Sequence, residues 1–160
     1  MAKVIHIEQF DMPERALPDG LNGDALRVAS VYNQINEGLF DMSNPEDQDV
    51  MLAEFVGRET FVVRGGSESD DYIRGIALYT PETEPKVSKI IGLAVDKPYR
   101  GEGIGSFLVA NLIMISRENG QKAIDVIAVE PAREFWSHKG FEPIKPRVDG
   151  PSLTTMRLIL

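Results

Sequence analysis

The sequence predicts a single α/β domain over residues 1–160, with a mixed sheet and the element order β-α-α-β-β-β-α-β-α-β-β. The length of 160 residues suits one domain, and the chain contains no repeat, linker or low-complexity tract. Short alternating or wholly apolar runs, typical of strands, are interspersed with runs of helical period. A glycine-rich segment at 101–105 joins an apolar strand directly to an apolar helix.

The first two elements are a strand and a helix. Residues 3–10 alternate apolar and polar side chains, which is typical of a half-buried strand. Residues 23–40 have a helical period, and Gly38 indicates fraying near the end of this helix. Their apolar stripe consists of Val28, Tyr32, Ile35 and Leu39.

A second helix is expected to begin after Ser43 and to continue to about Phe55. Ser43 is predicted to cap it, and Glu46, three residues later, would be the return half of a capping box. Pro45 also suits the first helical turn, because its missing N–H needs no partner there.

The pattern then changes to three strands, at 59–65, 72–80 and 88–95. Polar turns at 65–71 and 81–86 separate them. The third strand becomes apolar on both faces towards its end, which indicates a central position in the sheet.

The C-terminal third predicts a helix, a strand, a short helix and a hairpin. Gly120 is a typical residue to close the first of these helices. The expected ranges are helix 106–119, strand 121–129, helix 131–140 and hairpin strands 141–148 and 152–160 around a turn at 149–151.

Net charge, cysteine content and hydrophobicity limit the classes of function that this protein could have. The formal charge is −8 and the pI about 4.8, with no basic stripe, so nucleic acid is not an expected partner and cationic partners such as amines are mildly favoured. The absence of cysteine excludes disulfides, thiolate metal sites and cysteine nucleophiles. No apolar run has the length of a signal peptide or membrane span, so we expect a cytoplasmic protein with no membrane partner.

The glycine-rich loop is the most informative segment. Three glycines within five residues, followed at once by a helix, turn backbone N–H groups and the positive end of the helix towards one point. Such a site suits phosphate or pyrophosphate. The spacing excludes a Walker loop, since no lysine follows Gly105, and the dinucleotide fingerprint, since residue 106 is serine.

Residues 93–105 read Leu-Ala-Val-Asp-Lys-Pro-Tyr-Arg-Gly-Glu-Gly-Ile-Gly. This arrangement of an apolar strand end, Asp-x-x-Tyr and Arg-x-x-Gly-x-Gly resembles the acetyl-CoA signature of the GNAT N-acetyltransferase superfamily. The resemblance extends over about residues 58–145 and includes Lys139-Gly140-Phe141 after the last short helix. It implies the GNAT-like acyl-CoA N-acyltransferase fold.

The resemblance also implies acetyl-CoA as cosubstrate and no metal. The strand end would splay from its neighbour and free main-chain groups for the pantetheine arm and the thioester carbonyl, and the loop would wrap the pyrophosphate. The implied cofactor-binding residues are Leu93, Ala94, Val95, Arg100, Gly101, Glu102, Gly103, Ile104, Gly105 and Ser106.

The sequence departs from the family pattern at the catalytic positions. Family members commonly carry a tyrosine in the last short helix that protonates the departing sulfur, whereas this chain has Trp136, whose indole N–H cannot act as an acid. The usual glutamate of the preceding strand corresponds to Ile127, and the usual asparagine has no counterpart. The candidate catalytic residues are therefore Glu130 as base, His138, and Trp136, which we expect to fill space over the pantetheine. Tyr32 and Tyr79 could also reach the site, but we expect both to pack in the core.

We therefore expect an N-acetyltransferase that moves an acetyl group from acetyl-CoA directly to a primary amine, small or protein-borne, in a ternary complex. The alternative is a catalytically weak or inactive GNAT-fold protein that binds CoA or a protein partner. An ATP- or NAD-using protein is disfavoured by the loop spacing. The terminal hairpin is compatible with a homodimer or with a closed monomeric sheet.

Overall fold

The computed structural model describes residues 6–16, 20–21, 23–36, 38–65, 72–145 and 153–160. Within these ranges the predicted element order is confirmed, with a short 3-10 helix added after α1, β4 and β5. The elements are β1 (His6–Phe10), α1 (Gly23–Asn33), η1 (Gln34–Asn36), α2 (Pro45–Leu52), β2 (Glu59–Arg64), β3 (Ile73–Glu84), β4 (Val87–Val95), η2 (Lys97–Tyr99), α3 (Ile104–Glu118), β5 (Ala123–Val129), η3 (Glu130–Ala132), α4 (Arg133–His138), β6 (Glu142–Lys145) and β7 (Leu153–Ile159).

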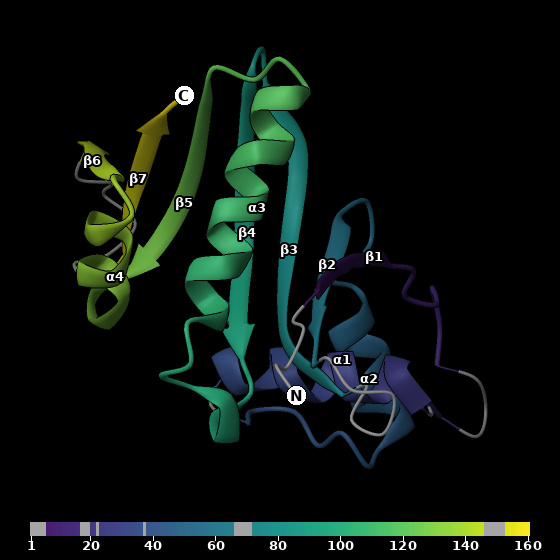
Figure 1. Cartoon of the computed structure of the whole chain (residues 1–160). Coiled ribbons are helices and arrows are strands. Elements are labelled where there is room, and N and C mark those ends of the chain that lie inside the picture. Colours follow the sequence, from purple (N-terminus) through teal and green to yellow (C-terminus); the bar gives the residue numbers. More distant parts are fainter. Residues whose placement is uncertain (1–5, 17–19, 22, 37, 66–71, 146–152) are drawn as a thin grey trace. The chain divides into compact units, whose positions relative to one another are not determined.

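The strands form one mixed sheet of seven strands in the order β1-β2-β3-β4-β5-β7-β6. The β4–β5 pair is parallel, and the β1–β2, β5–β7 and β6–β7 pairs are antiparallel. Figure 1 shows β5, β7 and β6 side by side, with β7 between the other two. The terminal hairpin therefore adds its second strand to the chain's own sheet, and the homodimer stays a prediction.

The chain divides into two compact units. One contains Met1–Leu78 and Gly92–Leu108, and the other contains Tyr79–Ile91 and Val109–Leu160. Strands β3 and β4 and helix α3 each contribute residues to both units. The single domain over residues 1–160 stays a prediction.

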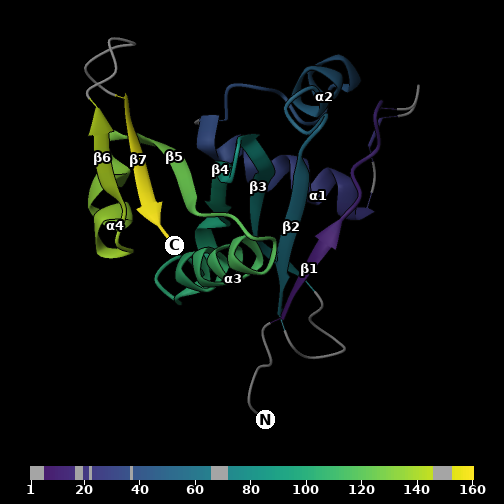
Figure 2. The same cartoon turned by 90° about the horizontal axis from the view of Figure 1, so that it is seen from above.

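In the first unit, α1 lies on one face of β3 and β4 and the start of α3 lies on the other (Figure 2). Two strand glycines allow this close packing. A Cβ on Gly75 would meet the Ile104 side chain of α3 at 2.8 Å, and one on Gly92 would meet the Tyr32 ring of α1 at 2.8 Å. The buried apolar side chains here include Val28, Val31, Leu52, Val62, Val63, Ile76, Leu78 and Leu108.

The second unit contains a buried polar chain in an otherwise apolar interior. The Ser116 hydroxyl lies 2.6 Å from the Tyr79 hydroxyl and 2.9 Å from the Ser88 hydroxyl, and all three side chains are buried. Buried hydroxyls need such partners because water cannot reach them. On β7, Arg157 donates to both carboxylate oxygens of Asp125 on β5, at 2.6 and 2.9 Å, which fixes the pairing of these strands.

Several local predictions were wrong. The helix expected over 23–40 ends at Asn33 and is followed by η1, and the helix expected to reach about Phe55 ends at Leu52. Ile35 and Leu39, predicted as part of the apolar stripe, are exposed. Asn44, not Ser43, caps α2, because its side chain accepts the Glu46 N–H at 2.9 Å while the Ser43 hydroxyl hydrogen-bonds Asp41. Residues 81–84, predicted as a turn, extend β3, so that only residues 85 and 86 separate it from β4. The predicted turns at 66–71 and 149–151 lie outside the described residues.

We expect Gly75→Ala to reduce the free energy of unfolding by about 1–3 kcal/mol, because the added methyl group overlaps the γ2 carbon of Ile104. Urea unfolding measures the loss. Ile104→Leu removes that carbon, so the double variant should lose less than the sum of the single variants. Strict additivity would contradict the contact.

Candidate functional site

Among the residues that the structure describes, the end of β4 has a free edge. The parallel ladder with β5 pairs Val87–Ile90 with Ala123–Val126 and includes no β4 residue beyond Ile90, although β4 continues to Val95. The Asp96 N–H donates to the Arg74 carbonyl of β3 at 2.8 Å. Because main-chain groups alternate along a strand, those of Leu93 and Val95 point away from β3. This is the edge on which the resemblance places a pantetheine arm.

The glycine-rich loop follows immediately. Gly101 and Gly103 have φ of 83° and 82°, values that favour glycine, and a Cβ on either would find no atom within 4 Å. They are therefore required for the backbone conformation rather than for packing within the described chain.

Helix α3 begins at the end of this loop, and its first intrahelical hydrogen bond runs from the Phe107 N–H to the Gly103 carbonyl at 3.0 Å. The N–H groups of Ile104, Gly105 and Ser106 therefore precede it and lack helical partners. A loop of exposed glycines that ends in N–H groups without helical partners is a typical arrangement for binding an anion such as phosphate.

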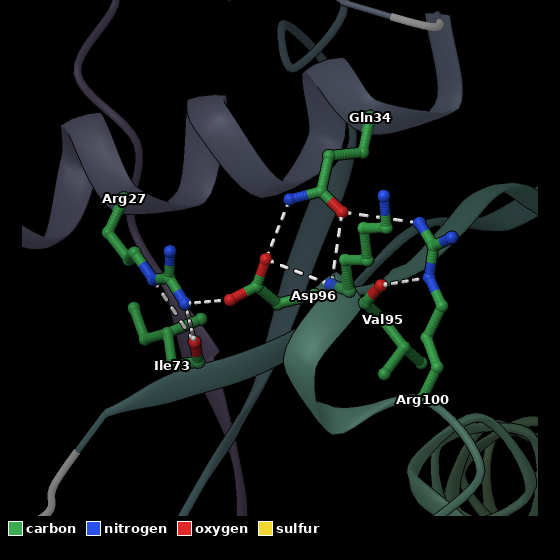
Figure 3. Close-up of polar contacts among 7 residues, drawn as sticks. Arg27, Gln34, Ile73, Val95, Asp96 and Arg100 are labelled. Atoms are coloured by element: carbon green, nitrogen blue, oxygen red, sulfur yellow. Dashed lines mark hydrogen bonds and ion pairs between the residues drawn. The ribbon is translucent and has the colours of Figure 1, made fainter.

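Asp96 joins this loop to the α1 segment (Figure 3). Its carboxylate accepts hydrogen bonds from Arg27 of α1, from the Gln34 amide of η1 at 2.7 Å, and from the Lys97 N–H at 3.0 Å. Arg27 also donates to the Ile73 carbonyl at the start of β3, at 3.2 Å. The Asp96 side chain is only 8% exposed, so these bonds are largely shielded from water.

Burial opposes ionisation of Asp96, but the hydrogen bonds from Gln34 and Arg27, the Arg27 charge and the Lys97 N–H outweigh it. Together they lower the pKa of this carboxyl below its ordinary value. Asp96 is therefore a carboxylate at neutral pH, which keeps all three donors in place.

Arg100, the first residue of the predicted anion site, is turned back towards β4. Its Nε donates to the Val95 carbonyl at 3.0 Å, and its Nη2 donates to the Gln34 amide oxygen at 3.2 Å (Figure 3). Gln34 thus contacts both Asp96 and Arg100. The Arg100 side chain therefore contacts the end of β4 and the Gln34 amide, and it is directed away from the glycine-rich loop.

The three predicted catalytic residues all belong to the second unit. Glu130, at the start of η3, is exposed. His138, the last residue of α4, is also exposed, and its Nε2 lies 3.7 Å from the Glu134 carboxylate. Trp136 is 5% exposed and packs edge-to-face on Phe141, with ring centroids 5.1 Å apart. Trp136 is thus a core residue of its unit, and its role over a pantetheine stays a prediction.

Sequence reasoning missed Arg27 and Gln34, which position the start of the loop through Asp96. An acidic residue directly between a buried strand and the Pro98 turn is a signal for such a role. Neither partner carried a comparable signal, because the two residues lie 69 and 62 positions away in the chain.

In the described part of the chain, no group of three or more His, Cys, Asp or Glu side chains could hold a metal ion. None of the helices described is long and apolar enough to cross a membrane.

Comparisons with known proteins concern the family pattern and the fold of this chain. The sequence model of the acetyltransferase (GNAT) family matches residues 28–141. No curated protein sequence matches the chain. The fold is similar to that of a GNAT-family acetyltransferase from Staphylococcus aureus Mu50, with a TM-score of 0.68, 19% identity and coverage of 98% of this chain and 99% of that one.

Two further solved structures are similar. A protein from Pyrococcus horikoshii OT3 has a TM-score of 0.70 and 21% identity, with 98% of this chain and 99% of that chain covered. N-acetylglutamate synthase from Neisseria gonorrhoeae, in complex with coenzyme A and N-acetyl-glutamate, has a TM-score of 0.70 and 15% identity. There the match covers 98% of this chain and 35% of that one. At such identities the likeness shows the fold alone.

We expect Asp96→Asn to reduce the free energy of unfolding by about 1–3 kcal/mol at neutral pH, because Arg27 loses its charged partner. The lowered pKa means that the carboxylate's contribution is complete above its ordinary pKa of 3.8 and is lost as pH falls through the folded-state value. The difference between the two proteins should therefore shrink in acid.

Urea unfolding at neutral pH and well below pH 3.8 measures this difference. Glu118→Gln, which changes an exposed carboxylate, is the control and should stay within about 0.5 kcal/mol of the parent. A pH-independent difference for Asp96→Asn would exclude the ion pair as its cause.

Proposed function

This chain belongs to the acetyltransferase (GNAT) family, and from that premise we propose that it is an acetyl-CoA-dependent N-acetyltransferase. It transfers the acetyl group directly to a primary amine within a ternary complex. The observation that carries the proposal is the loop at residues 101–103, whose two exposed positive-φ glycines lead into the N–H groups of α3 that precede its first intrahelical hydrogen bond.

In this proposal the cosubstrate is held mainly by backbone groups. The N–H groups from Gly101 to Ser106 bind the pyrophosphate, with the positive end of the α3 dipole behind them. The free edge of β4 at Leu93 and Val95 binds the pantetheine arm and orients the thioester. Acetyl-CoA, when bound, supplies an activated acetyl group.

Transfer requires one bond to form and one to break. The amine nitrogen bonds to the acetyl carbon, the carbon–sulfur bond breaks, the nitrogen loses a proton, and the sulfur gains one. We assign Glu130 as the group that takes the amine proton, directly or through water, with His138 as the second candidate. Both are exposed, so each is open to exchange of protons with solvent.

The acceptor is proposed as an amine, either a small molecule or a protein amine. The net charge of −8 favours cationic acceptors, because a negative field attracts them. The wall of the acceptor site is proposed to include Leu39 in the α1–α2 connection, which is 76% exposed. An exposed leucine there offers an apolar surface to the acceptor.

A second candidate function is a GNAT-fold protein that binds CoA with little or no catalysis. It is favoured by the burial of Trp136 against Phe141 at the position where the resemblance expects a proton donor. The intact glycine loop supports CoA binding in either case.

We expect acetyl-CoA and free CoA, but not ATP or NAD, to raise the melting temperature of this protein. A ligand at a hundred times its Kd adds about 2.7 kcal/mol of stability. Differential scanning fluorimetry with the four ligands at equal concentration tests this.

Gly103→Ala is the matched variant, because an alanine is strained at a φ of 82° and its methyl group would project into the site. It should abolish the shift produced by both CoA compounds. Equal shifts with all four ligands, or none at millimolar CoA, would refute the cofactor assignment.

We expect Trp136→Tyr to raise turnover with a reactive amine if the chain is an enzyme and to leave a non-catalytic binder inactive. The smaller side chain and its buried hydroxyl should reduce the free energy of unfolding by about 1–3 kcal/mol. Trp136→Phe is the control for size without a hydroxyl. An equal rate change in both variants would show that packing, not proton donation, causes it.

A further inference from the structure

Tyr32 of α1 is nearly buried, yet its hydroxyl has no hydrogen-bond partner among the residues that the structure describes. The side chain is 6% exposed, and its ring packs edge-to-face on Phe55 with centroids 5.3 Å apart. The hydroxyl oxygen is not among the described side-chain atoms that are both shielded from solvent and without a partner, so it is accessible although the ring is packed. Tyr32 therefore presents an accessible hydrogen-bond donor on a fixed ring, which is a suitable arrangement for a ligand contact.

The hydroxyl lies against the end of β4. Its oxygen is 3.1 Å from the point that a Cβ on Gly92 would occupy. Gly92, Ala94 and Asp96 share one face of the chain here because side chains alternate along a strand. Asp96 binds Arg27 and Gln34 on that same face, so the α1–η1 segment runs along it (Figure 3).

Gly92 also precedes Leu93, where the edge assigned to the thioester begins. Any side chain at position 92 would collide with the Tyr32 ring, since even a Cβ would lie 2.8 Å from its Cε2. The glycine therefore allows the phenol to reach the main chain of β4 itself. This closeness places the hydroxyl beside the proposed reaction centre within one compact unit.

The other three tyrosines are less suitable as donors. The Tyr79 hydroxyl is already paired with Ser116 at 2.6 Å. Tyr72 and Tyr99 contact each other, with ring centroids 6.4 Å apart, and each ring also carries an arginine, Arg27 over Tyr72 and Arg74 over Tyr99. Their rings are thus held in a cation–π cluster.

We propose that Tyr32 is a further catalytic residue, whose hydroxyl donates a hydrogen bond and then its proton to the sulfur that leaves during acetyl transfer. This inference rests on the proposed function. The Tyr32 phenol, which belongs to α1, would supply the proton that the indole of Trp136 on α4 cannot supply.

Burial raises the pKa of the Tyr32 phenol, and the charge of Glu54 raises it further, while Arg58 lowers it. The hydroxyl is therefore protonated at neutral pH and available as a donor. As the amine nitrogen bonds to the acetyl carbon and the carbon–sulfur bond breaks, Tyr32 Oη gives its proton to the sulfur. The amine proton passes to Glu130 and from there to solvent, which returns a proton to Tyr32, so the step is balanced.

The test compares the binding of CoA and of desulfo-CoA, which lacks the sulfur, to Tyr32→Phe by titration calorimetry near pH 8.5, where a thiol is about half ionised. A hydrogen bond to a charged group predicts that the variant loses about tenfold or more in CoA affinity. Its affinity for desulfo-CoA should be unchanged. If the chain turns over, kcat should fall about 10²-fold or more at an unchanged KM for acetyl-CoA.

Tyr79→Phe is the matched control, because it removes a hydroxyl that has a partner. It should lower the melting temperature by roughly 2–4 °C without a sulfur-specific loss of affinity, whereas Tyr32→Phe should leave the melting temperature unchanged.

The outcomes separate this inference from the proposed function. Equal affinities of parent and Tyr32→Phe for CoA, or parallel losses for CoA and desulfo-CoA, would overturn the role of Tyr32 whether or not the protein is an enzyme. A sulfur-specific loss in a parent protein that acetylates no amine would support the contact and reject the acetyltransferase assignment.

Discussion

The Asp96 carboxylate is the constraint on which the rest of the site depends. A buried carboxylate needs charged or strongly polar partners, because burial alone disfavours its ionised form. Arg27, Gln34 and the Lys97 N–H supply them from α1, η1 and η2. One side chain thereby fixes where α1 lies on β4 and where the chain turns into the glycine loop. The position of Tyr32 on Gly92 follows from the same placement of α1.

The glycines in and around the site have two different structural roles. Gly75 and Gly92 are glycines because neighbouring side chains occupy the space that a methyl group would need. Gly101 and Gly103 are glycines for the opposite reason, because the backbone turns through the left-handed region with open space around it. Dense packing thus holds α1 and the start of α3 on the strands. The glycine-rich loop between β4 and α3 leaves its backbone exposed.

The sequence was sufficient for the element order and for the turn of glycines before α3, because both depend on local patterns. Periodicity separates strands from helices, and three glycines before a helix have few alternative explanations. It was insufficient where a competing hydrogen bond or a distant contact decides the structure. Asn44 and Ser43 are equally good caps in the sequence, and only the competing hydrogen bond of Ser43 to Asp41 separates them. Likewise, nothing local distinguishes Tyr32 from the other apolar-stripe residues until Gly92 lies against it.

The division into two units has a consequence for the order in which the nascent chain can fold. The first unit has all its residues once Leu108 is synthesised. The second requires β7, which follows β6 in the chain and lies between β5 and β6 in the strand order. Since chains emerge from the ribosome N-terminus first, β6 lacks its neighbour in the described sheet until β7 has been synthesised. The glycine-rich loop and Tyr32 can therefore reach their final environment before β6 has its neighbouring strand β7.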